Sequence, residues 1–126
     1  MGKKKKDPKN TKDLEDDAEH LVEQQLRTSL EEIKTSEDVI GYILRNSTSA
    51  TIDLKDPGKI IDYALLSSSA FDASEVLSEE FQLGDVKNVI VEGKDAKMLS
   101  LTVEKNKTSV FMHKRADHKK ILKKIQ

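Results

Sequence analysis

The sequence of 126 residues has no cysteine, no tryptophan and only five glycines. The absence of cysteine excludes disulfides, thiolate nucleophiles and Cys-ligated zinc. The glycines do not cluster into a phosphate-cradling loop, and no serine lies in a G-x-S-x-G motif. No two of the three histidines have the i,i+4 spacing that places a metal pair on one helix face. We therefore expect a protein that is not an enzyme and that needs no cofactor or metal.

Long apolar runs are also missing. The longest are a few residues, so we expect no insertion into a membrane, and the N-terminus lacks the apolar core of a signal peptide. Met1 and Gly2 resemble the start of a myristoylation signal, but Lys6 occupies the position where serine or threonine is required. The sequence therefore predicts a cytoplasmic protein.

Charge is nearly balanced, at −1, but it is unevenly distributed. Residues 1–12 contain six lysines against one aspartate, residues 13–38 are acidic, and the last fourteen residues are basic. The first ten residues have no apolar side chain after Met1 and therefore cannot offset the entropy of ordering. We predict a disordered lysine-rich tail over residues 1–12 and a single domain over residues 13–126.

Three segments have helical periodicity. The first covers residues 13–34 and carries one apolar stripe with a repeat of three to four residues. The second begins with Asp56 as N-cap and Pro57 at the first position, and runs to about Phe81. Its small residues 67–70 would either permit a close helix–helix approach or divide the helix in two. A short basic helix follows Asp117 at the C-terminus. The predicted stripe of the first helix consists of Leu14, Ala18, Leu21, Val22, Leu26, Leu30 and Ile33.

Five segments are typical of strands, at residues 39–44, 50–54, 86–92, 97–103 and 108–113. The order is helix, two strands, helix, three strands, helix. It predicts an α/β (α+β) sandwich: a five-stranded, antiparallel-type sheet with helices on both faces.

Two surfaces could bind a partner. The third strand follows a crossover helix and is a candidate sheet edge, and the alternative is that it is a buried central strand. Paired with the small residues of the second helix, an edge strand predicts a homodimer with a sheet continued across the two-fold axis. The C-terminal helix carries a basic patch. This patch is either the solvated side of a helix that packs on the sheet, or a nucleic-acid-binding surface, although it lacks the aromatic side chains that would stack on bases. The predicted dimer-interface residues are Val86, Asn88, Ile90, Ser68 and Phe71, and the basic patch is Lys119, Lys120, Lys123 and Lys124.

Three segments carry a family resemblance: EDVIGYILR at residues 37–45, VKNVIVEG at residues 86–93 and AKMLSLTV at residues 96–103. Over residues 14–126 the chain resembles the roadblock (dynein light chain) family, regulators and scaffolds of Ras-like GTPases. It departs from the family in having NSTS at residues 46–49, where an Asp-Gly-like turn is common, and in a very short connection before the second helix.

The resemblance implies a roadblock/profilin-like fold and no catalysis. It also implies dimerisation through the second helix and third strand, and binding of a Ras-like GTPase by the helical face of the dimer. Our leading hypothesis is therefore a homodimeric adaptor that binds such a GTPase. A nucleic-acid-associated protein using the lysine tail and the C-terminal helix is the alternative. A small-molecule sensor would need a pocket that sequence does not reveal.

Overall fold

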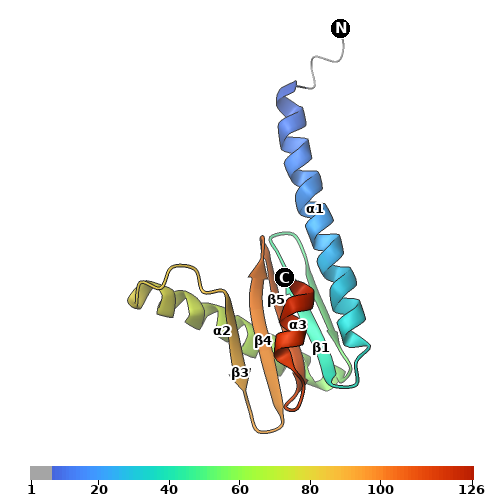
Figure 1. Cartoon of the computed structure of the whole chain (residues 1–126), viewed down its shortest axis with the longest axis vertical. Helices are drawn as coiled ribbons and strands as arrows, with labels where there is room; N and C mark the ends of the chain where they lie inside the picture. The colour runs from blue at the N-terminus through green and yellow to red at the C-terminus, as the bar shows by residue number, and fades with distance from the viewer. Residues whose placement is uncertain (1–6) are drawn as a thin grey trace.

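The computed structural model describes residues 7–126, with side chains from Asp17 onward. It contains the predicted order of helices and strands, together with one short 3-10 helix, η2, before α2 (Figure 1). The elements are α1 (Asp7–Lys34), β1 (Val39–Arg45), β2 (Ala50–Leu54), η2 (Pro57–Lys59), α2 (Ile60–Glu80), β3 (Asn88–Glu92), β4 (Ala96–Val103), β5 (Asn106–His113) and α3 (His118–Ile125).

The five strands form one antiparallel sheet in the order β2-β1-β5-β4-β3. The predicted fold class is confirmed, and so is the prediction that the third strand lies at an edge, because β3 pairs only with β4 within the described chain. The strand begins at Asn88, whereas the sequence predicted Val86.

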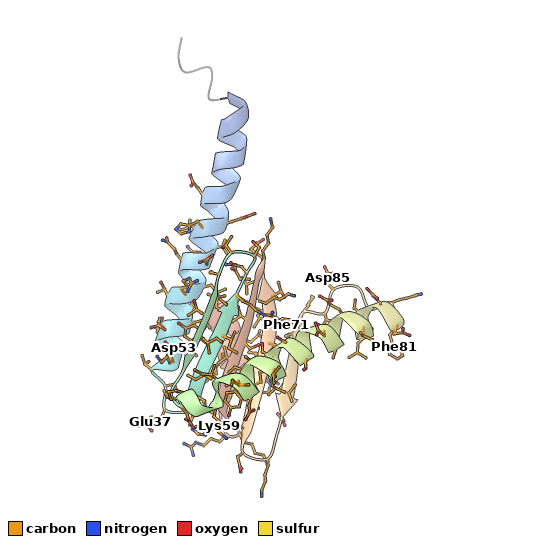
Figure 2. The ribbon with its side chains drawn as sticks, turned by 180° about the vertical axis from the view of Figure 1, so that it is seen from behind. Glu37, Asp53, Lys59, Phe71, Phe81 and Asp85 are labelled. Carbon is orange, nitrogen blue, oxygen red and sulfur yellow. The ribbon has the colours of Figure 1, made fainter. Side chains whose placement is uncertain are left out.

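The helices cover both faces of the sheet. α1 and α3 pack on one face around a core that includes Leu30, Leu99 and Ile121. α2 packs on the other face, which is in front in Figure 2, around Phe111 and Met98. The result is three layers with the sheet in the middle.

α1 is longer than predicted. It begins at Asp7, inside the segment predicted as a lysine-rich tail, and residues 1–6 lie outside the described chain. Proline suits the first turn of a helix because its φ is already fixed there, and Pro8 follows the first residue directly. The N-terminal part of α1 projects past the end of the sheet (Figure 1). Leu21 is therefore exposed and does not continue the buried stripe of Leu26, Leu30 and Ile33.

Gly41 permits a close approach between β1 and β2. The pairing of β1 with β5 shifts register between Val39 and Gly41, and Gly41 has a φ of +156°. A Cβ atom at this position would lie 2.3 Å from the carbonyl oxygen of Asp53 and 2.7 Å from Cα of Leu54. A residue with a side chain cannot adopt this conformation without displacing β2.

α2 is one continuous helix, so of the two alternatives for its small residues, the division of the helix does not occur. Asp56 caps the 3-10 turn that precedes it, since its side chain accepts a hydrogen bond from the backbone N–H of Gly58 at 3.0 Å. Ser67 faces the sheet, where its hydroxyl lies 2.6 Å from that of Ser109, which in turn lies 2.6 Å from that of Ser100. The small residue thus serves close packing of helix on sheet through a buried chain of three hydroxyls.

Candidate functional site: the α2–β3 edge

The C-terminal half of α2 extends past the edge of the sheet. α2 crosses the sheet diagonally, and its last turns project beyond β3 in both views (Figures 1 and 2). A helix needs a surface on which to bury its apolar residues, and these turns have none within the described chain.

Large apolar side chains are consequently exposed around this overhang. Phe81 is 68% exposed and Leu83 is 62% exposed, although side chains of this kind normally stabilise a core. Two further groups accompany them: Leu66 and Leu77 on one flank of α2, and Val91 on the neighbouring strand. Contiguous apolar surface on a small domain is typical of a protein-binding site.

β3 adds an unpaired strand edge to this apolar surface. Cross-strand pairing puts Val91 opposite Met98, on the face covered by α2, and puts Ile90 opposite Leu99, on the α3 face. The outer side of β3 has no neighbouring strand in the described chain. Its backbone groups can therefore hydrogen-bond to a strand of another molecule.

The predicted interface residues fall into two groups. Ile90 is exposed, and Val86 and Asn88 are partly buried at or beside the edge strand. Ser68 is also partly buried, but it follows Ser67, which packs on the central strand β5, so it lies away from the edge. Phe71 is only 6% exposed, because it points into the chain between α2 and the sheet, with the cations of Arg45 and Lys107 over its ring. It therefore offers little surface to a partner. The sequence prediction missed four exposed apolar residues. Leu66 and Leu77 could have been found because α2 carries apolar residues on more than one face, and Phe81 and Leu83 because they are large apolar residues in and just before the turn at Gly84.

The basic patch lies on the outer side of α3. Ile121 and Ile125 are buried against the sheet, and Asp117 caps the helix through the backbone N–H groups of Lys119 and Lys120. The arrangement agrees with the solvated side of a packed helix. The four predicted lysines, Lys119, Lys120, Lys123 and Lys124, are all exposed.

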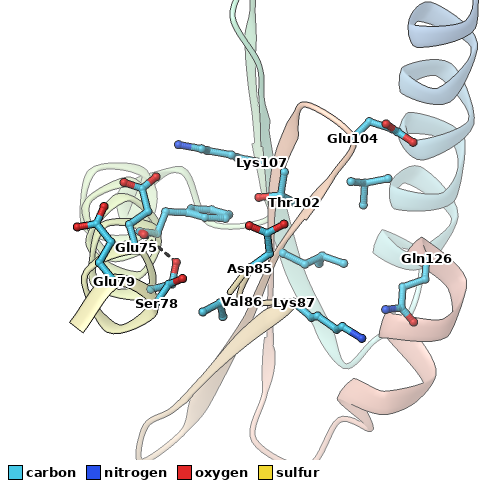
Figure 3. A pocket seen from close by; sticks show the side chains of 14 residues that line it. Glu75, Ser78, Glu79, Asp85, Val86, Lys87, Thr102, Glu104, Lys107 and Gln126 are labelled. Carbon is cyan, nitrogen blue, oxygen red and sulfur yellow. Dashed lines mark hydrogen bonds between the residues drawn. The ribbon is translucent and has the colours of Figure 1, made fainter. Parts of the chain in front are cut away.

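A pocket of about 770 Å³ lies on the other flank of the α2 overhang (Figure 3). Its walls come from α2, from the loop between α2 and β3, and from the adjoining ends of β4 and β5. Because these segments are far apart in the sequence, the sequence prediction did not include this pocket.

Two side chains with perturbed pKa values lie elsewhere, where α1 meets the sheet. The pKa of Tyr42 is raised, first by burial and then by the hydrogen bond that its hydroxyl donates to Glu31. The pKa of Lys34 is raised chiefly by its hydrogen bond to Asp53, 2.6 Å away. Both residues attach α1 to the sheet. Over residues 17–126 no three His, Cys, Asp or Glu side chains are grouped so that they could hold a metal ion.

The raised pKa of Tyr42 predicts that the protein loses stability at alkaline pH. A pKa raised in the folded state means that the native protein holds this proton more tightly, so the stabilisation is present below about pH 10 and is lost as pH rises above it. Tyr42→Phe should be less stable than the wild type by about 1 to 2 kcal/mol at neutral pH. The difference should shrink at about pH 11 in urea denaturation. Lys34 is unchanged in both proteins, so a difference that stays constant with pH would contradict this role of Tyr42.

No helix within the described residues is long and apolar enough to span a bilayer. No protein-family model matches the sequence, and no curated protein matches it either.

Solved structures do match. The fold is similar to a Roadblock/LC7 domain from Streptomyces avermitilis, with a TM-score of 0.58 and 17% identity over 70% of this chain and 77% of that one. It is also similar to MglC from Myxococcus xanthus, with a TM-score of 0.53 and 18% identity over 80% of this chain and 90% of that one. The resemblance seen in the sequence is thus confirmed at the level of the fold: the chain has the roadblock fold.

Proposed function

We propose that this chain is a non-catalytic homodimeric adaptor of the roadblock type that binds a Ras-like GTPase. The observation that carries the proposal is the α2 overhang beside an unpaired β3, which leaves an apolar surface and a strand edge at the same border of the domain.

The dimer forms by antiparallel pairing of β3 with β3 of a second copy. The two sheets then become continuous, and the overhanging half of each α2 lies over the sheet of the other molecule. This arrangement buries Leu77 and Val91, which a monomer leaves in contact with water. It also satisfies the outer backbone groups of both edge strands.

The GTPase binds the outward side of the paired α2 helices. Ser67 and Phe71 face the sheet, so helical spacing places Ile61, Leu65 and Val76 on the opposite side of α2, where all three are exposed. Their exposure supports a second apolar contact that is separate from the dimer edge. The link to a Ras-like GTPase rests on the family resemblance and the shared fold.

Light scattering at micromolar concentration tests the dimer. The wild type should give about twice the mass of the 14.2 kDa chain, and Ile90→Lys should give the monomer mass, because it places a charge at the centre of the strand pairing. Ile52→Lys is the matched control: Ile52 is 38% exposed on the opposite edge strand, against 37% for Ile90. A monomeric wild type, or equal effects of the two substitutions, would overturn the proposed interface.

Capture from native cytosol tests the partner. Immobilised wild-type protein should retain a Ras-like GTPase, identified by mass spectrometry, and Leu65→Asp should abolish retention while the dimer mass is unchanged. Leu21→Asp, an equally polar change at an exposed leucine of α1, should have no effect. Retention of nucleic acid in place of a GTPase, lost when residues 1–12 are deleted, would favour the alternative function.

A further inference from the structure

The outer side of β3 presents a defined set of backbone groups at the edge of the sheet (Figure 1). The N–H of Gly93 donates to the carbonyl oxygen of the first residue of β4 at 2.8 Å, and the pairing of β3 with β4 continues without a shift as far as Asn88. Successive residues of a strand direct their backbone groups to opposite sides, so every second residue before Gly93 also bonds to β4. The residues whose N–H and C=O groups point outward are Asn88, Ile90 and Glu92.

The sequence of β3 is nearly the same in both directions. The strand reads NVIVE, so Ile90 is flanked on each side by a valine and then by a polar residue. A contact across a two-fold axis puts residue i against residue j and residue j against residue i, so a palindromic strand matches its own copy in antiparallel pairing. The strand also contains neither proline nor lysine, the residues that often protect a strand edge from such pairing. Its pattern therefore favours a second copy of this chain as the occupant.

One register satisfies both the backbone groups and the side chains. With Ile90 opposite Ile90 of the second copy, every outward residue meets an outward residue, and the two strands exchange about six hydrogen bonds. Val89 then lies opposite Val91 on the face covered by α2, and Asn88 lies opposite Glu92 on the α3 face. A shift of two residues loses one of these pairs and puts Ile90 opposite a polar residue. A shift of one residue opposes side chains that belong to different faces of the sheet.

Asn88 and Glu92 have side chains that this register would pair. Neither side chain forms a hydrogen bond or an ion pair within residues 17–126. We propose that β3 selects a second copy of this chain in the register centred on Ile90, with Asn88 and Glu92 as its self-recognition pair. The amide of Asn88 donates to the carboxylate of Glu92 in the other copy, and the two-fold axis repeats this contact. A strand without the reciprocal groups leaves them unpaired, which disfavours other partners. This inference rests on the proposed homodimer and adds the residues that determine its specificity.

Loss and rescue of the dimer test the self-recognition pair. Asn88→Asp puts two carboxylates opposite each other at both ends of the paired strands, and it should raise the dimer dissociation constant about tenfold in analytical ultracentrifugation. Adding Glu92→Gln to Asn88→Asp pairs amide with carboxylate again, in the reverse order, and should return the constant to within about threefold of the wild type. Adding Glu37→Gln instead gives the same net charge at an exposed residue before β1 and should not rescue. Equal rescue by both changes, or no rescue by Glu92→Gln, would overturn the pair.

Because the chain has no cysteine, engineered cysteines test the register directly. Asn88→Cys and Glu92→Cys chains, mixed in equal amounts and mildly oxidised, should form a disulfide-linked dimer, since opposed residues of a hydrogen-bonded pair have Cα atoms about 5.5 Å apart. Neither variant alone should do so, because its two cysteines lie about 14 Å apart along the strands. Crosslinking of either variant alone as readily as the mixture would overturn the register. A wild type that is dimeric in light scattering, with variants that crosslink wrongly, contradicts the register alone, whereas a monomeric wild type contradicts the dimer itself.

Discussion

Replacing Gly41 with alanine is expected to lower the free energy of unfolding by about 3 to 5 kcal/mol. Two costs add. The φ of +156° is one that side-chain-bearing residues rarely adopt, and the new Cβ would lie within 2.7 Å of both Cα and Cδ2 of Leu54. Backbone atoms of a paired strand cannot yield as a flexible side chain can, so β2 must move away from β1. Urea denaturation followed by circular dichroism measures the loss.

Gly84→Ala distinguishes the cost of the positive φ from the cost of the close contact. Gly84 also has a positive φ, of +75°, but a Cβ there would meet no heavy atom within 4 Å. Only the conformational cost applies, so a loss of about 1 to 2 kcal/mol is expected. If Gly84→Ala and Gly41→Ala proved equally destabilising, the close approach of β1 and β2 would not be what requires glycine in the first strand.

Phe111→Ala is expected to destabilise the chain by about 3 to 5 kcal/mol. Phe111 is 2% exposed at the centre of the core beneath α2, and its ring stacks on that of Tyr63 with centroids 4.4 Å apart. Truncation removes the buried ring and leaves a cavity between β1, β4 and α2. Hydrogen exchange should accelerate in α2 more than in α1, because α1 packs on the other face of the sheet.

Phe81→Ala is the matched control for the loss of a phenyl ring. Phe81 lies at the exposed end of α2, so its removal should change stability by less than about 0.5 kcal/mol. Both variants are best compared in the Ile90→Lys background, in which association does not contribute to the measured free energy. A large loss from Phe81→Ala in that background would show that the end of α2 packs on its own chain.

Regular periodicity was sufficient to predict most of the fold. The alternation of Leu99, Leu101 and Val103 and the apolar repeat of Leu26, Leu30 and Ile33 each assign one face to a core, and the structure buries those faces. The start of α1 was not predictable in the same way. A helix can continue into water when its residues permit it, and local sequence does not indicate where the sheet beneath it ends.

The interface was only partly predictable, for a different reason. Ile90 could be chosen because an apolar strand after a crossover helix is a candidate edge. Phe71 was assigned to the interface together with the small residues of the second helix, and the sequence does not say which face of that helix packs on its own sheet. The pocket could not be predicted at all, since its lining residues come from α2, from the loop before β3 and from the ends of β4 and β5.

The buried serine chain has a consequence at the opposite end of α2. Apolar contacts have no preferred direction, so a helix held by them alone can slide along a sheet. A slide of one helical turn, about 5.4 Å, would separate Ser67 from Ser109 and leave buried hydroxyls unpaired at about 1 to 3 kcal/mol each. The three hydroxyls therefore fix α2 at one position along the sheet. They determine how many turns of α2 overhang β3, and so the spacing at which Leu77 and Phe81 meet another molecule.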